Sequence, residues 1–359
     1  MEPEPARREP FVDVEPPPDA EAVRPALPGP GRLVGRSLAV LRRVAPNVRR
    51  GALAIGLQFL GLLGPVLVLV AAAIARLPDP TILFGDGPPA APADAELVGL
   101  VGIGMLVALA GGTALAVESR AIGLGLLGAA AQGRSFALSA ALRRSRQSFW
   151  RLVGLSLAIE LPLGVVGSFL GEALAGPSAA GSPLATGLGF LVGLVLQVPI
   201  VYAAPGIVLG DLGLRAALRA SVGLVRATPR LVPVVVGVGA AAQVLLVIAL
   251  NGGLEIVARV AEAADLGLTG DPLRTFAAIA LLLGATSAAG SLFFTVTCLA
   301  VAPQALVAAL ARPTPGLDRA LTEEAASGPS RWLTVPMVLA IATAVVVSVV
   351  GIQNVVGRG

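Results

Sequence analysis

One acidic residue, Glu160, lies inside the otherwise apolar stretch SLAIELPLGVVGSFLG, and it is the residue whose position best suits chemistry. It follows Arg151 by nine positions, so a helix would carry it roughly 13 Å beyond that charge. An ionisable group at such a depth in a membrane costs about 2.5 kcal/mol or more and marks a candidate proton or substrate site. The candidate polar partners from other apolar stretches are Gln197, Gln243, Gln58 and Tyr202.

A structural role for Glu160 is the alternative. In that interpretation the carboxyl group is protonated or touched by water beside Pro162, and it is hydrogen-bonded to a neighbouring helix without a function of its own. The sequence leaves both interpretations open.

The other residue types argue against catalysis. The chain has no histidine, which excludes Ser-His-Asp catalysis and histidine metal sites, and its single cysteine, Cys298, lies in an apolar run. The glycine-rich GLGLLG at 123–128 continues an apolar span and follows no strand, so it does not indicate a dinucleotide site. We therefore expect a protein that is not an enzyme and that uses no metal or cofactor.

The elements that must position Glu160 are apolar stretches long enough to cross a bilayer. Hydrophobic residues make up 55% of the 359 residues and charged residues only 13%, well below the quarter typical of soluble domains. A membrane-spanning helix needs about 20 apolar residues, and its backbone hydrogen bonds must be made internally. The sequence therefore predicts an all-α, polytopic membrane helix bundle with six or seven transmembrane helices, near 51–75, 97–117, 152–174, 185–209, 231–251, 276–300 and 333–355.

Two of these stretches carry glycines at a spacing that suits close helix packing. The sequences are GSFLG at 167–171 and GFLVG at 189–193. Small residues four positions apart let membrane helices approach closely, and we expect this packing to occur within one chain.

The arginine distribution predicts the orientation in the membrane. All 26 basic residues are arginine, which suits a GC-rich bacterial genome. The segments up to 50 and at 118–151, 210–230 and 311–332 hold 22 of them, which leaves four for the other side. The positive-inside rule then places the N-terminus in the cytoplasm, in a bacterial plasma membrane. Since the arginines do not share one soluble face, we expect no nucleic-acid partner.

Basic segments near 32–46, 133–151 and 211–228 predict amphipathic elbow helices on the cytoplasmic side. In the last of them Asp211 and three arginines fall within about 80° of one another on a helix. The first repeats its R-x3-R-x6-R-x2-P frame. We expect these arginines to contact anionic phospholipid headgroups, and a solvated basic helix is the alternative. The six predicted headgroup arginines are Arg32, Arg36, Arg43, Arg215, Arg219 and Arg226.

The polar segments predict the domain organisation. Residues 1–30 hold nine prolines and seven acidic residues, so we expect a disordered cytoplasmic leader, with docking to a membrane or cytoplasmic protein as the alternative to a passive role. A six-span membrane domain is expected at 31–310, a cytoplasmic linker at 311–332 and an additional C-terminal span at 333–359. Glu118 and Arg120, at the cytoplasmic end of the second span, are expected to form a surface pair or cap.

Two segments resemble a bacterial family of multi-pass proteins, the membrane region of glycerophosphoryl diester phosphodiesterases. They are AAPGIVLGDLGLRAALRASVGLVR at 203–226 and GRSFALSAALRRSRQSFWRLV at 133–153. The resemblance covers about 32–310. The soluble catalytic domain of the diesterases uses histidine, which this chain lacks, so the resemblance implies a membrane region without the diesterase activity.

Two functions are compatible with the sequence. The first is a non-enzymatic structural or accessory role at the membrane. The second is a transporter or lipid-handling permease with a mid-membrane site formed by Glu160, Gln197 and Gln243. A scaffold predicts a dry bundle packed by small residues, whereas a transporter predicts a cavity that Glu160 and the glutamines line.

Overall fold

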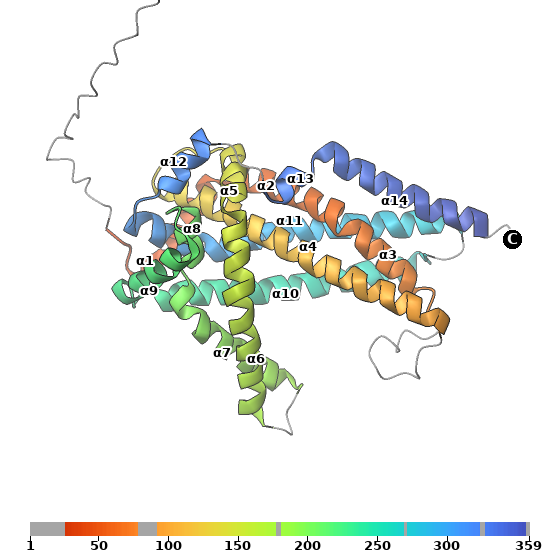
Figure 1. Ribbon diagram of the computed structural model, residues 1–359, viewed down its shortest axis with the longest axis horizontal. Coiled ribbons are helices and arrows are strands. Elements are labelled where there is room, and N and C mark those ends of the chain that lie inside the picture. The colour runs from red at the N-terminus through yellow and green to blue at the C-terminus, as the bar shows by residue number, and fades with distance from the viewer. Residues whose placement is uncertain (1–25, 78–91, 177–180, 269–270, 324–326, 357–359) are drawn as a thin grey trace, which may run out of the picture.

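The computed structural model describes residues 26–77, 92–176, 181–268, 271–323 and 327–356, and the regular structure of these residues is helical (Figure 1). Among the described residues, five helical segments are long and apolar enough to cross a membrane: Ala95–Ala131, Leu138–Ala175, Pro183–Val208, Val232–Ala263 and Pro272–Ala311. The predicted all-α bundle of membrane spans is thereby confirmed. Most of the predicted leader lies outside the described residues.

The first predicted span differs from a single straight helix. Helices α2 (Ala45–Leu62) and α3 (Gly64–Ile74) are bent by 43° and make a sixth span only if the bent pair counts as one. The bend falls at Gly64-Pro65, where proline removes a backbone donor from the helix ladder. The last predicted span corresponds to helix α14 (Val335–Val356), which contains the apolar stretch Val335–Val350.

The long helices α4 (Pro92–Ala131), α10 (Val232–Ala263) and α11 (Pro272–Ala311) run along the length of the molecule (Figure 1). Helix α4 continues well past the predicted span end at 117, so GLGLLG is helical and buried. The main core lies where the second half of α4 and the second half of α11 meet α5 (Leu138–Leu155) and α8 (Ala203–Val208). Toward the opposite end, large apolar side chains such as Leu106, Leu109 and Ile248 are exposed, as lipid-facing surfaces are.

Helices α6 (Leu161–Ala175) and α7 (Pro183–Gln197) form a hairpin that crosses the long helices (Figure 1). Its two arms touch backbone to backbone at glycines. A Cβ added at Gly171 would lie 2.2 Å from the backbone nitrogen of Gly189, and one at Gly167 would lie 2.7 Å from the Cα of Gly193. The predicted intrachain packing of the two glycine motifs is confirmed.

Both arms leave α-helical geometry at the same junction with the bundle. One arm contains a π-helical turn, η2 (Ser156–Glu160), just before Pro162, and the other contains a 3₁₀ turn, η4 (Val198–Ile200), around Pro199. Single π-helical turns of this kind are frequent at functional sites. In the second arm the Ser221 hydroxyl donates to the Pro199 carbonyl and accepts from the Tyr202 amide, so the broken backbone is satisfied.

The basic helices α1 (Pro30–Arg43) and α9 (Leu214–Ala227) lie at the same end of the molecule (Figure 1). Each buries a stripe at positions i, i+4 and i+7 against the bundle, which accounts for its amphipathic pattern. The buried residues are Leu33, Ser37 and Val40 in α1 and Ala217, Ser221 and Leu224 in α9. The third predicted elbow differs, because α5 continues through the π-helical turn η2 into α6 as one helical span, Leu138–Ala175.

The segment predicted as a linker, 311–332, contains two short helices, α12 (Pro315–Thr322) and α13 (Pro329–Trp332). Helix α12 packs on α5 and α8, and helix α13 packs on α4 and α5. The amide of Gly316 donates to the Leu209 carbonyl. A Cβ at Gly316 would lie 2.4 Å from the Val208 carbonyl oxygen, so glycine is required for this approach.

The glycine contact yields a stability prediction. Gly171→Leu adds a Cβ that would lie 2.2 Å from the backbone nitrogen of Gly189. Overpacking of this kind lowers the free energy of unfolding by about 1–3 kcal/mol. Gly164→Leu is the matched control on the same helix, because an added Cβ there meets no atom within 4 Å. In detergent, Gly171→Leu should unfold at a clearly lower temperature than wild type and Gly164→Leu should not. Equal melting temperatures for the two variants would contradict the backbone contact.

Candidate functional site

A cavity of about 930 Å³ lies where the α6–α7 hairpin departs from the long helices. Helices α4, α6, α7, α10 and α11 and the turn η2 contribute to its wall, which is mainly apolar. Pockets that hold small molecules typically measure about 300–1,000 Å³ and combine apolar walls with a few polar groups. The polar and charged side chains on this wall are Thr113, Arg120, Ser156, Glu160, Gln197, Gln243, Thr297 and Gln304.

An ion pair joins two of these groups. Arg120 Nη1 on α4 donates to Glu160 Oε1 at the end of η2 at 2.6 Å, and the two side chains are 23% and 22% exposed. The Ser156 hydroxyl donates to the other carboxylate oxygen, Oε2, at 3.0 Å. The carboxylate that sequence singled out is therefore paired with a cation and also faces the cavity.

The cavity brings together the three predicted site residues, Glu160, Gln197 and Gln243. Gln58 and Tyr202, the other predicted partners of Glu160, are buried elsewhere and do not line it. Sequence reasoning missed Arg120 as the partner.

The expected surface pair or cap of Glu118 and Arg120 is wrong, since α4 continues to Ala131 beyond both residues. Glu118 is fully buried and accepts hydrogen bonds from the Ser145 hydroxyl at 3.1 Å and the Ser330 amide at 2.8 Å. Residues two positions apart on a helix do not face each other, so the spacing itself already argued against a pair. The two charges point to different sides of α4, one into the core and one into the cavity.

Aromatic side chains form another part of the cavity wall. Phe149 packs edge-on against Trp150 and against Trp332 of α13, with ring centroids 5.2 Å and 5.9 Å away. The α13 segment is held there by Arg146, which donates to the hydroxyl and the carbonyl of Ser330. The segment predicted as a linker thus contributes a tryptophan to the cavity.

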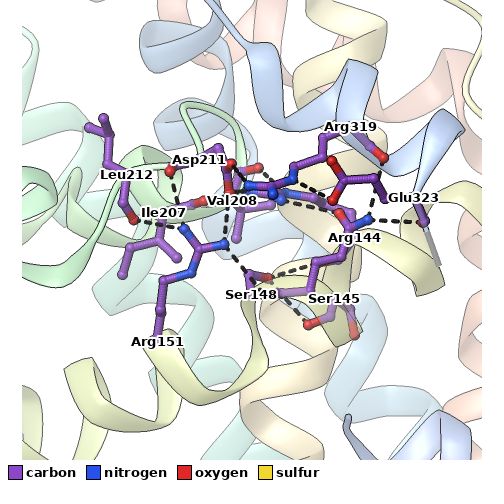
Figure 2. Close-up of polar contacts among 11 residues, drawn as sticks. Arg144, Ser145, Ser148, Arg151, Ile207, Val208, Asp211, Leu212, Arg319 and Glu323 are labelled. Carbon is purple, nitrogen blue, oxygen red and sulfur yellow. Dashed lines mark hydrogen bonds and ion pairs between the residues drawn. The ribbon is translucent and has the colours of Figure 1, made fainter. Parts of the chain in front are cut away.

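A second charged cluster centres on Asp211, which lies just beyond the end of the Pro183–Val208 span (Figure 2). Its carboxylate accepts from Arg144 at 2.8 Å and Arg151 at 2.7 Å, both on α5, and from Arg319 on α12 at 2.5 Å. Arg144 is fully buried and also donates to the carbonyls of Ile207 and Val208. The cluster ties α5, α12 and the α8–α9 turn together.

The prediction that Asp211 belongs to the basic face of an amphipathic helix is wrong. Helix α9 begins at Leu214, and Asp211 has a left-handed φ of 52° in the preceding turn. Burial alone would raise the pKa of this carboxyl group, but the hydrogen bonds from Arg144, Arg151 and Arg319 hold the pKa far below its usual range. Asp211 therefore stays ionised at physiological pH and acts as an internal counter-ion.

The six headgroup arginines have a different environment. All six side chains are exposed, on α1 and α9, and none makes a hydrogen bond or ion pair with another described residue. This leaves Arg32, Arg36, Arg43, Arg215, Arg219 and Arg226 available for external anions, while their contact with lipid remains a prediction.

Comparison of the chain with protein-family models, curated proteins and solved structures gives no match. The resemblance to the membrane region of glycerophosphoryl diester phosphodiesterases therefore stays a prediction. Within the described residues, no group of three or more His, Cys, Asp or Glu side chains could hold a metal ion.

The Asp211 cluster predicts a large effect of charge removal. Asp211→Asn leaves the buried Arg144 with carbonyl acceptors only, and we expect a loss of about 3 kcal/mol in the free energy of unfolding. Asp318→Asn is the matched control, because its pair with Arg134 is exposed and should contribute at most about 1 kcal/mol. Denaturant unfolding followed by tryptophan fluorescence measures both, and similar losses would refute the role of Asp211.

The same variant predicts the pH dependence. Because the pKa of Asp211 is lower in the folded state than its unfolded value of about 3.9, its stabilisation is complete above that value and is lost as the pH falls toward the folded pKa. Wild type should therefore lose more stability than Asp211→Asn when the pH is lowered below about 4.

Proposed function

We propose that this chain is a lipid-handling membrane protein without catalytic activity, which takes an amphiphilic molecule from the bilayer into the cavity beside Glu160. The observation that carries the proposal is the cavity itself, which combines largely apolar walls with an inward-facing ion pair. This is the second of the two functions compatible with the sequence. It is favoured over a passive scaffold because a scaffold has no need of a cavity.

The length of the cavity suits one acyl chain. On α4 its wall extends from Arg120 back to Leu106, which is about 21 Å of helix. One leaflet of the hydrocarbon core is about 15 Å thick, half of the total of about 30 Å. A lipid with its headgroup at Arg120 and Glu160 would place its acyl chain along Leu109 and Leu106.

The exposed arginines support a location at an anionic membrane surface. We propose a bacterial plasma membrane, with the N-terminus and the basic helices α1 and α9 on the cytoplasmic side. Each arginine near an anionic surface contributes about 1 kcal/mol of attraction. The headgroup arginines would then anchor the end of the bundle from which the cavity extends.

Filling the cavity tests the proposal. Gly239 and Gly237 both lie on α10, and an added Cβ at either meets no atom within 4 Å, but of the two only Gly239 lines the cavity. Gly239→Phe should abolish the saturable labelling of α4 and α10 by a photoactivatable phospholipid in nanodiscs. Gly237→Phe should label like wild type. If wild type shows no saturable labelling there, or if Gly239→Phe labels equally, the cavity does not bind lipid.

Cysteine labelling tests the orientation. In a Cys298→Ala background, Arg219→Cys lies on α9 and Leu273→Cys lies at the start of α11, beyond the far end of α10. A membrane-impermeant maleimide added to intact spheroplasts should label position 273, whose side chain is 73% exposed, and not position 219. Both should react after lysis. Labelling of 219 from outside would reverse the proposed topology.

A further inference from the structure

We infer that the cavity selects an amphiphile whose headgroup carries both a negative and a positive charge, with the anionic group at Arg120 and the cationic group at Glu160. This inference rests on the proposed function, because it names the class of ligand that the same cavity binds. It is carried by the charge balance of the wall and by hydrogen-bonding capacity that the protein leaves unused.

The charge balance of the wall is neutral. Among the described residues that line the cavity, Arg120 and Glu160 are the only charged side chains. They are 2.6 Å apart, and each is more than three-quarters buried. A headgroup that enters here therefore meets a cation and an anion together.

A headgroup of a single sign is disfavoured by this arrangement. An anionic group that binds Arg120 brings its charge close to the Glu160 carboxylate or draws the guanidinium away from it, and leaving a buried charge without its partner is costly. A cationic group at Glu160 has the converse effect on Arg120. A headgroup with both charges satisfies each side chain, and discrimination then comes from the repulsion that single-sign headgroups meet.

The ion pair has unused hydrogen-bonding capacity. A guanidinium carries five N–H donors, and Arg120 makes one hydrogen bond to the described part of the protein. Its free donors suit a phosphate, which guanidinium groups bind in a bidentate way. Glu160 accepts one hydrogen bond on each oxygen, and a carboxylate has about four lone-pair sites, so an ammonium group can still bind.

The glutamine amides of the wall are also unpaired. Gln197 and Gln243 make no side-chain hydrogen bond to another described residue, and Oε1 of Gln304 is buried without a partner. Gln243 is exposed and Gln197 partly exposed, whereas the Gln304 oxygen is buried, and a buried polar atom without a partner is uncommon and calls for an explanation. Amide groups both donate and accept, so they suit the uncharged ester and hydroxyl groups next to a lipid phosphate.

The experiment compares three lipids with identical acyl chains: phosphatidylethanolamine, which carries both charges, phosphatidylglycerol, which is anionic, and a trimethylammonium diacyl lipid, which is cationic. Binding to the purified full chain in detergent is measured by native mass spectrometry. Only the binding that Gly239→Phe removes is counted, because anionic lipid also binds exposed arginines. Wild type should bind phosphatidylethanolamine about tenfold more tightly than either other lipid, which corresponds to about 1.4 kcal/mol.

Glu160→Gln separates the two charges. It keeps the side-chain shape and leaves Arg120 as the single charge of the wall, so the preference should shift at least about tenfold toward phosphatidylglycerol. Glu172→Gln, on the exposed end of the same helical arm, should keep the wild-type preference. If Glu160→Gln does not fold, the double variant Arg120→Gln with Glu160→Gln should bind all three lipids without preference.

The outcomes distinguish the inference from the proposed function. Equal binding of the three lipids by wild type, or an unchanged preference in both Glu160→Gln and the double variant, would overturn the selection of a doubly charged headgroup and leave lipid binding intact. No binding that depends on Gly239, for any of the three lipids, would overturn the proposed function itself.

Discussion

A charge inside a chain this apolar must find its counter-charge or its hydrogen bonds within the protein, and this requirement organises the structure. Asp211 neutralises a fully buried arginine and ties together three elements that are distant in sequence. Glu118 is buried and accepts hydrogen bonds from α5 and α13. These contacts join α5, the α8–α9 turn and helices α12 and α13 into one polar end of an otherwise apolar bundle. Because α5 continues through η2 into α6, the contacts that hold α5 also bear on the direction in which the hairpin leaves the bundle.

The cavity lies where the hairpin leaves the bundle. Figure 1 shows the hairpin crossing the long helices, and the residues that line the cavity come from both the hairpin and those helices. The π-helical turn that ends at Glu160 lies at this junction, on the cavity wall. Helices α6 and α7 pack mainly against each other, through close contacts at their glycines. The hairpin is thus a unit with its own interface, attached to the bundle through two irregular turns.

The arginines of the basic segments fall into two sets with different environments. Arg144, Arg146 and Arg151 on α5 and Arg319 on α12 bind internal acceptors, and Arg144 is completely buried. Those on α1 and α9 are exposed and have no protein partner among the described residues. Both sets look alike in sequence, as arginines spaced along amphipathic helices. The difference comes from which face of each helix meets the bundle, and this decides whether a guanidinium stabilises the fold or remains available to lipid.

The helices, five of the seven predicted membrane spans and the intrachain packing of the two glycine motifs were predictable from the sequence, because these depend on local composition and on spacing along one helix. The sequence also identified Glu160, Gln197 and Gln243 as polar groups in apolar surroundings. The partners of the charged groups were not predictable in this way, because Arg120 is 40 positions from Glu160 and Arg319 is 108 positions from Asp211. Spacing within one helix cannot reveal such pairs, since they depend on how the helices cross. For the same reason Asp211 was misassigned to a helical face, as the left-handed turn that aims it at α5 is stabilised by arginines from other elements.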